Sequence, residues 1–313
     1  MKKIKGVNYM PNISTVTALI NGQSYNLTLN SGTGKYEAVI TAPSKSSYTV
    51  NDEHYYDVSV TATDTANNST TVNASHATLG ESLKLVVKEK VAPVITIVSP
   101  SSGATLTNNK PVITVDITDN DSGVDTSSFS LVVDSGAAVT WDDGTPEEIS
   151  DGYRWTYTPT NALGDGAHTI KIDVSDNDGN AAAQKTSTVT VDTTPPTLDV
   201  TAPENDSWTN ALSGTVTGTT NDATSSPVTV TIKVNSVDQG DVTVESSGAF
   251  SHEVTYVEGD NTLVITATDA AGKESTVTRT VHVNTVAPEI VSVVIAPNPV
   301  DAGSTYTITV EVE

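Results

Sequence analysis

Apolar residues recur at every second position in many short segments of this chain, with polar residues between them. Such alternation is the pattern of a β-strand that buries one face. Clear examples are Ile170, Ile172, Val174, Leu263, Ile265 and Ala267. Val, Ile and Thr, which favour strands, are abundant, and long stretches rich in Ala, Leu, Glu and Lys are absent. The pattern therefore predicts an all-β fold.

Three segments share one arrangement, in which two alternating strands flank a turn rich in Asp, Asn, Gly and Ala. They are YYDVSVTATDTANNSTTVNA (55–74), AHTIKIDVSDNDGNAAAQKTSTVTVDTTPP (167–196) and NTLVITATDAAGKESTVTRTVHVNTVAPE (261–289). Each segment is predicted to be a β-hairpin that closes one repeat.

Prolines separate the repeats. Pro93, Pro196 and Pro288 recur at intervals of about 100 residues, the length of a seven-stranded antiparallel sandwich. Proline has no N–H to give to a neighbouring strand and restricts the residue before it to extended conformations. The joints are therefore expected to be short and stiff, which favours tandem β-sandwiches in an extended rod.

The turn and linker motifs resemble a known family. DVSDNDGN (173–180), TATDAAGKES (266–275), VDTTPP (191–196) and VNTVAP (283–288) look like the tandem immunoglobulin-like (Big-type) repeats of bacterial surface proteins and of tailed-phage virion proteins. The resemblance covers residues 91–313 and implies immunoglobulin-like domains. The expected division is a first domain over 1–90, a second over 91–193, a third over 194–287, and a partial domain or terminal β-hairpin over 288–313.

The last 26 residues are expected to form two strands, at roughly 290–296 and 305–312. Two strands do not make a stable sandwich by themselves. One interpretation is a domain that continues in a longer protein. The other is a hairpin that pairs with other virion or surface proteins through these C-terminal strands.

Charge and composition narrow the choice of partners. Lys plus Arg number 15 and Asp plus Glu number 38, so the net charge is −23 and nucleic acid would be repelled. The chain has no cysteine, which excludes disulfides and thiolate chemistry. No apolar stretch is long enough for membrane insertion. The N-terminal MKKIKGVNYMPNISTV has lysines but no apolar segment after them, so no general secretory signal is expected.

No catalytic motif is present in the sequence. The five histidines are scattered and form no H-E-x-x-H pair, and neither a G-x-S-x-G elbow nor a phosphate-binding glycine loop occurs. We therefore expect the protein not to be an enzyme.

Two acidic loops carry a calcium hypothesis. DITDNDSGVD (116–125) and DVSDNDGN (173–180) place several carboxylates in one turn, and Ca²⁺ takes six to eight oxygen ligands. The candidate ligands are Asp116, Asp119, Asp121, Asp125, Asp173, Asp176 and Asp178. The alternative is solvated turns, because Asp and Asn also bond their own backbone. No other cofactor is indicated.

Aromatic residues gather in the second repeat, beside acidic hydrogen-bond acceptors. Trp141 and Tyr153 are candidate contacts for a host-surface polysaccharide, whereas Trp155 is expected in the core. Trp208 is expected to cap the end of the third sandwich near its linker.

Together these features favour a non-enzymatic structural or adhesive protein. The leading hypothesis is a phage virion component of the tail or an appendage, with spacer domains that contact host glycans. The alternatives are a fragment of a bacterial cell-surface adhesin, and non-catalytic carbohydrate-binding modules of a secreted enzyme. The expected location is the virion, or else the bacterial surface or the medium.

Overall fold

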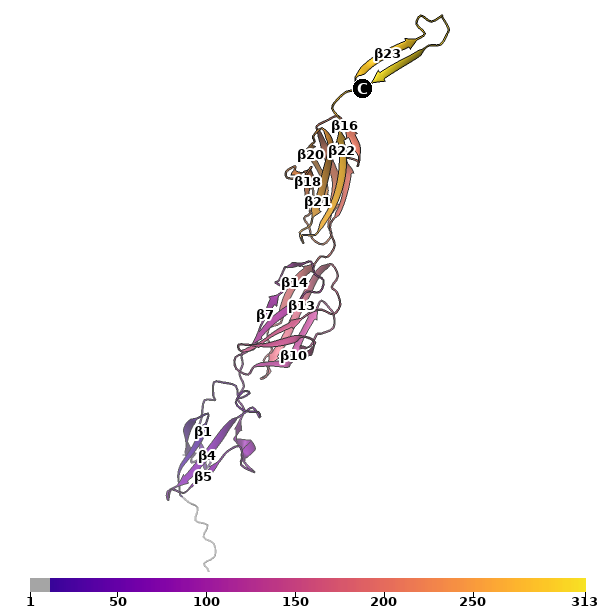
Figure 1. Cartoon of the computed structure of the whole chain (residues 1–313). Helices are drawn as coiled ribbons and strands as arrows, with labels where there is room; N and C mark the ends of the chain where they lie inside the picture. Colours follow the sequence, from indigo (N-terminus) through magenta and orange to yellow (C-terminus); the bar gives the residue numbers. More distant parts are fainter. Residues whose placement is uncertain (1–11) are drawn as a thin grey trace, which may run out of the picture. The chain divides into compact units, whose positions relative to one another are not determined.

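The computed structural model describes residues 12–313, and its regular structure is β-strand apart from two short 3₁₀ turns, η1 (Gly80–Leu83) and η2 (Trp141–Asp143) (Figure 1). The all-β prediction is confirmed. The N-terminal segment MKKIKGVNYMP lies outside the described residues. Within residues 12–313, no helix is long and apolar enough to cross a membrane.

The chain divides into two compact units. The first contains the residues up to 104 together with 110–162 and 167–189, and the second contains 105–109, 163–166 and 190–313.

The first unit begins with a single antiparallel sheet. Its strands are β1 (Ile13–Ile20), β2 (Gln23–Asn30), β3 (Lys35–Glu37), β4 (Tyr56–Asp64), β5 (Ser69–Val72) and β6 (Lys84–Leu85), in the order β3-β2-β1-β4-β5 with β6 paired to β4. The alternating residues Val16, Ala18 and Ile20 of β1 are buried. Asn21 and Gly22 join β1 to β2 with positive φ angles of 46° and 75°, as a tight two-residue hairpin requires.

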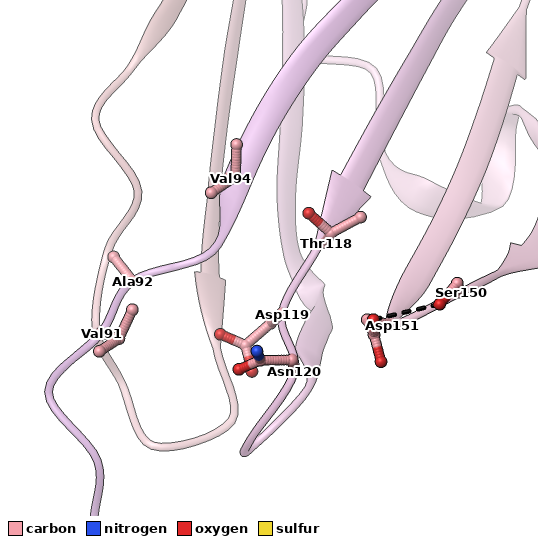
Figure 2. Close-up of a pocket in the computed structure, with 8 residues that line it drawn as sticks. All are labelled: Val91, Ala92, Val94, Thr118, Asp119, Asn120, Ser150 and Asp151. Carbon is pink, nitrogen blue, oxygen red and sulfur yellow. Dashed lines mark hydrogen bonds between the residues drawn. The ribbon is translucent and has the colours of Figure 1, made fainter.

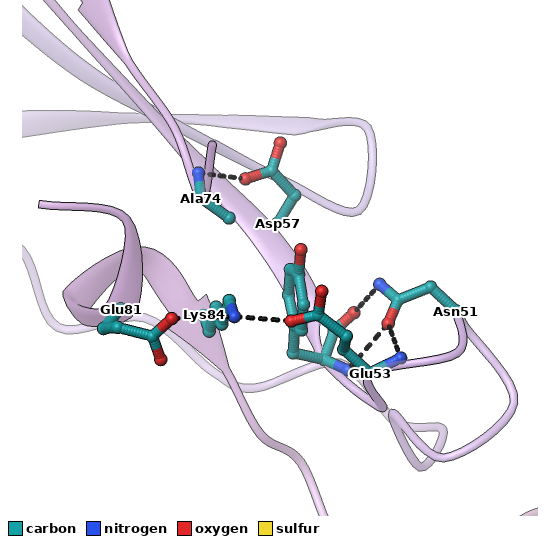
Figure 3. Close-up of polar contacts among 7 residues, drawn as sticks. Asn51, Glu53, Asp57, Ala74, Glu81 and Lys84 are labelled. Carbon is teal, nitrogen blue, oxygen red and sulfur yellow. Dashed lines mark hydrogen bonds and ion pairs between the residues drawn. The ribbon is translucent and has the colours of Figure 1, made fainter. Parts of the chain in front are cut away.

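Lys84 ties β6 to the neighbouring loop (Figure 3). Its Nζ lies 2.5 Å from Glu53 Oε2 and 2.9 Å from Glu81 Oε1, and these hydrogen bonds raise the pKa of Lys84. Asn51 holds the same loop, because its side-chain oxygen accepts the N–H of Glu53 at 3.0 Å. Asp57 accepts the N–H of Ala74 at 2.8 Å. These contacts are structural.

The rest of the first unit carries two sheets around one core. One sheet has the order β11-β12-β9-β7, and in the other β10 pairs with β13. The strands are β7 (Val94–Ser99), β9 (Ile113–Thr118), β10 (Val124–Val133), β11 (Thr145–Ile149), β12 (Gly152–Tyr157) and β13 (Gly166–Asp176). Side chains from both sheets, including Val115, Leu131 and Ile172, form one buried cluster. The two sheets are therefore the layers of a β-sandwich.

The second unit includes the end of β14 (Lys185–Val191), where Thr190 and Val191 pair in parallel with β8 (Thr105–Leu106). It continues as a sandwich whose sheets have the orders β15-β17-β20 and β16-β22-β21-β18-β19. The strands are β15 (Thr197–Ala202), β16 (Ser207–Thr209), β17 (Ser213–Asn221), β18 (Thr229–Val234), β19 (Val237–Asp238), β20 (Ala249–Thr255), β21 (Gly259–Thr268) and β22 (Glu274–Val283). Val216, Phe250 and Ile265 represent its core, to which both sheets contribute.

A final hairpin, β23 (Ile290–Ala296) and β24 (Thr307–Val312), ends the second unit, close to the two predicted strands. Every residue of the hairpin is exposed, including Ile295 and Ile308. Antiparallel pairing of these two strands repeats that of β7 with β9 and of β15 with β17. The hairpin therefore shares its antiparallel pairing with the first strand pair of each sandwich.

Candidate functional site

Asp116, the first predicted metal ligand, is bound by an arginine. Nε and one terminal nitrogen of Arg154 each lie 2.8 Å from an Asp116 carboxylate oxygen, across the neighbouring strands β9 and β12. This pair lowers the pKa of Asp116 and raises that of Arg154. The charge that Asp116 would offer to a cation is thus already neutralised.

Four more of the predicted ligands are engaged by their own loops or by neighbouring segments. Asp125 accepts the N–H of Ser127 at 3.0 Å, and Asp173 accepts Gln184 Nε2 at 2.8 Å. Asp121 accepts the N–H of Ser46 at 2.9 Å. These residues do not gather around a common point with Asp119 and Asp176.

Asp178 accepts the N–H of Glu89 at 2.9 Å, and its carbonyl accepts Lys88 Nζ at 3.0 Å. The acidic loops therefore hold residues 45–46 and 88–89 against the sandwich of the same unit.

The structure brings Asp119 and Asp176 together, with Glu89 as a third member. One carboxylate oxygen from each lies within 4.8 Å of the others. Glu89 was not a predicted ligand, because it lies in the linker segment VKEK, far from both loops in sequence. Its Oε1 accepts the N–H of Ser122 at 2.7 Å, which fixes it beside the loop after β9.

Most oxygens of this cluster already have protein donors. Asp176 is buried, and its two oxygens accept the N–H and the side-chain amide of Asn180 at 2.7 and 2.6 Å. Asp119 Oδ1 accepts the N–H groups of Asp121 and Gly123 at 3.0 and 2.8 Å. Such bonds satisfy carboxylates in a turn without a metal.

A shallow cavity of about 280 Å³ opens at the edge of this cluster. Figure 2 shows Asp119 and Asn120 between residues 91–92 and the turn at Ser150 and Asp151. Because Asp119 belongs to both the cluster and the cavity wall, solvent reaches this side of the cluster.

The predicted glycan contacts pack at the rim of the core of the first-unit sandwich. Trp141 lies edge-on to Phe129 and Tyr153, with ring centroids 5.5 and 5.2 Å apart. Trp155 is completely buried, as expected, and its Nε1 donates to the carbonyl of Trp141 at 2.9 Å. Tyr153 also lines an open groove of about 400 Å³ together with Tyr48, so it retains access to a ligand.

Trp208 is the tryptophan with the largest exposed fraction. The prediction that it caps the end of the sandwich is wrong. Its side chain on β16 is 72% exposed, and the indole stacks on His282 at 4.6 Å between centroids. His282 in turn contacts Asp260, with 2.6 Å between Nδ1 and Oδ1. A short edge strand leaves the outer face of this ring in solvent.

The repeated two-layer sandwiches define a protein of tandem immunoglobulin-like domains. Residues 93–172 match the family model of a bacterial Ig domain, and residues 196–285 match that of domain B of glucodextranase. The predicted resemblance to bacterial immunoglobulin-like repeats is thereby confirmed.

Comparison with solved structures returns tandem domains of similar kinds. Fibronectin(III)-like modules of CbhA from Clostridium thermocellum are 20% identical at a TM-score of 0.35, over 61% of this chain and 94% of theirs. A 1.5-MDa bacterial ice-binding adhesin is 19% identical at a TM-score of 0.31, over 88% of both chains. No curated protein matches the chain.

Proposed function

We propose that this chain is a non-enzymatic structural and adhesive component of a phage virion, in its tail or an appendage. The observation that carries the proposal is the repetition of one immunoglobulin-like scaffold, followed by the exposed hairpin of β23 and β24. Such scaffolds serve as spacers and adhesive modules, and their function depends on the surfaces they present. The net charge of −23 disfavours contact with nucleic acid and suits a solvent-exposed particle surface.

The partner surface in this proposal is the β23–β24 hairpin. Apolar side chains are exposed on one of its faces, where Val293 and Ile295 of β23 lie opposite Val310 and Ile308 of β24. Exposed strand edges and apolar faces are where another chain adds strands. The hairpin would therefore join the chain to another protein of the particle.

Location on the particle separates the virion role from that of a bacterial surface adhesin. Antibodies against the chain, coupled to gold, should label purified phage particles in electron micrographs and leave uninfected host cells unlabelled. Pre-absorption of the antibody with the purified chain is the control. Label confined to the cell envelope would refute the virion role and support the adhesin.

Glycan contact is a second part of the proposal, and the exposure of Trp208 favours it. A flat apolar ring stacked on His282, which itself contacts the acceptor Asp260, suits the apolar face and the hydroxyls of a sugar. Many copies on one particle would turn weak single contacts into firm attachment.

Binding to an array of bacterial surface glycans tests this contact, measured for the natural chain, Trp208→Ala and Tyr153→Phe. Trp208→Ala should lose at least tenfold in binding, because the exposed ring is removed, and Tyr153→Phe should bind like the natural chain. Loss in Tyr153→Phe alone would move the contact to the groove beside Tyr48. Unchanged binding in both variants would refute both locations, the Trp208 ring and the groove beside Tyr48.

A further inference from the structure

A second group of three carboxylates lies in the second unit and was not predicted from the sequence. Asp192 directly follows β14, Asp222 follows β17, and Asp269 follows β21. One oxygen from each lies within 4.8 Å of the others, and all three residues are buried, with exposed fractions of 0, 7 and 6%. The group is therefore more enclosed than the cluster of Glu89, Asp119 and Asp176.

No basic side chain balances these three negative charges. Within residues 12–313, none of the three aspartates forms an ion pair with lysine, arginine or histidine. Three buried carboxylates in one place repel each other, and burial of unpaired charge is unfavourable. A cation between the three carboxylates would offset this repulsion.

The hydrogen bonds around the group leave one buried oxygen without a donor. Asp222 Oδ1 accepts the N–H groups of Thr224 and Ser225, both at 2.7 Å, and Asp192 accepts the hydroxyl of Ser225. Asp269 Oδ1 accepts the N–H groups of Ala271 and Lys273, both at 2.8 Å. Asp269 Oδ2 is buried and has no hydrogen-bond partner, the one such carboxylate oxygen within residues 12–313.

The corresponding turns of the chain explain why this oxygen is open. Asp64 and Asp176 occupy the same position at the end of β4 and β13, and each is followed four residues later by an asparagine. The side-chain amides of Asn68 and Asn180 donate to the second carboxylate oxygen at 2.9 and 2.6 Å. At Asp269 the fourth residue is Lys273, which offers no such amide.

We propose that Asp192, Asp222 and Asp269 bind a divalent cation, and that the cation is Ca²⁺. All of the donors are oxygens, with neither histidine nor cysteine in the group, and hard carboxylate oxygens suit Ca²⁺. Three carboxylates supply part of the six to eight ligands, and water and backbone carbonyls complete the set. The ion ties the segment after β14 to the loops after β17 and β21.

Isothermal titration of the metal-stripped full chain with CaCl₂ tests the site directly. The natural chain should bind Ca²⁺, and Asp269→Asn should lose this binding at least tenfold. Asp64→Asn, the matched change in the turn after β4, should retain it, because Asp64 belongs to neither carboxylate group. Lys273→Asn should weaken it at least tenfold, because the new amide would occupy Asp269 Oδ2 as Asn180 occupies Asp176.

Melting temperatures in EDTA and in CaCl₂ distinguish a metal ligand from a residue with a purely structural role. Without the ion, Asp269→Asn should melt at or above the natural chain, because it relieves repulsion and keeps both backbone bonds. With Ca²⁺ the natural chain should melt higher, because the ion binds only the folded state.

Absence of Ca²⁺ binding by the natural chain would overturn the proposal, as would equal binding by Asp269→Asn. Circular dichroism confirms that each variant is folded. If Asp269→Asn does not fold, Asp222→Asn takes its place in both measurements, with the same expected loss.

Discussion

At the residue scale, Trp155 illustrates how one side chain organises a core. Its ring lies 4.5 Å from that of Phe129, and its indole nitrogen is satisfied by the carbonyl of Trp141. Gly144 passes so close that a Cβ there would lie 2.2 Å from Trp155 Cε2. The alternation of Tyr153, Trp155 and Tyr157 predicts a buried ring, but the approach of Trp141 depends on a 3₁₀ turn that no local pattern reveals.

The Asp116–Arg154 pair leads to a pH-dependent prediction. Arg154 lowers the pKa of Asp116 in the folded state. The pair therefore stabilises the fold at pH values above the ordinary aspartate pKa of about 3.9. That stability is lost as the pH falls through the lower folded pKa. Asp116→Asn should therefore reduce the free energy of unfolding at pH 7 by up to about 1 kcal/mol, and the deficit should vanish in strong acid.

Urea unfolding of both proteins at pH 7 and at low pH measures this difference. Asp199→Asn is the matched control, because Asp199 lies exposed on β15 and takes part in no ion pair within the described chain. An equal deficit for Asp116→Asn at both pH values would show that the ion pair is not its cause.

At the element scale, period-two alternation was sufficient to locate several of the hairpins. The hairpins β4–β5 and β21–β22 and the final hairpin lie in the segments where the sequence predicts them. The single sheet formed by residues 13–85 was not foreseen, because alternation shows which side chains are buried and does not show how strands are divided between sheets.

Local sequence patterns could not predict the acidic clusters, for a similar reason. The calcium hypothesis rested on two loops that are rich in aspartate. In the structure Asp116 pairs with Arg154, and Asp121 and Asp178 accept backbone N–H groups. Glu89 and Asp192 each come from a linker with few other acidic residues nearby. Their place in a cluster depends on where the chain crosses the turns of a sandwich, which only the tertiary structure defines.

At the scale of the whole molecule, the regular proline joints predict an extended rod. A compact chain of this length would have a radius of gyration of about 20 Å, and tandem sandwiches in a line would have a considerably larger one. Small-angle scattering in dilute solution measures this radius directly. A profile of a near-spherical particle would contradict the prediction.

The residue four places after each turn aspartate has a consequence for how such repeats diversify. An asparagine at this position donates to the second carboxylate oxygen of the aspartate, whereas Lys273 leaves that oxygen of Asp269 without a donor from the turn. One amino-acid exchange at this position therefore decides whether a duplicated module responds to the mineral content of its medium. The exchange leaves the hydrophobic core untouched, so a lineage can gain or lose this sensitivity one module at a time.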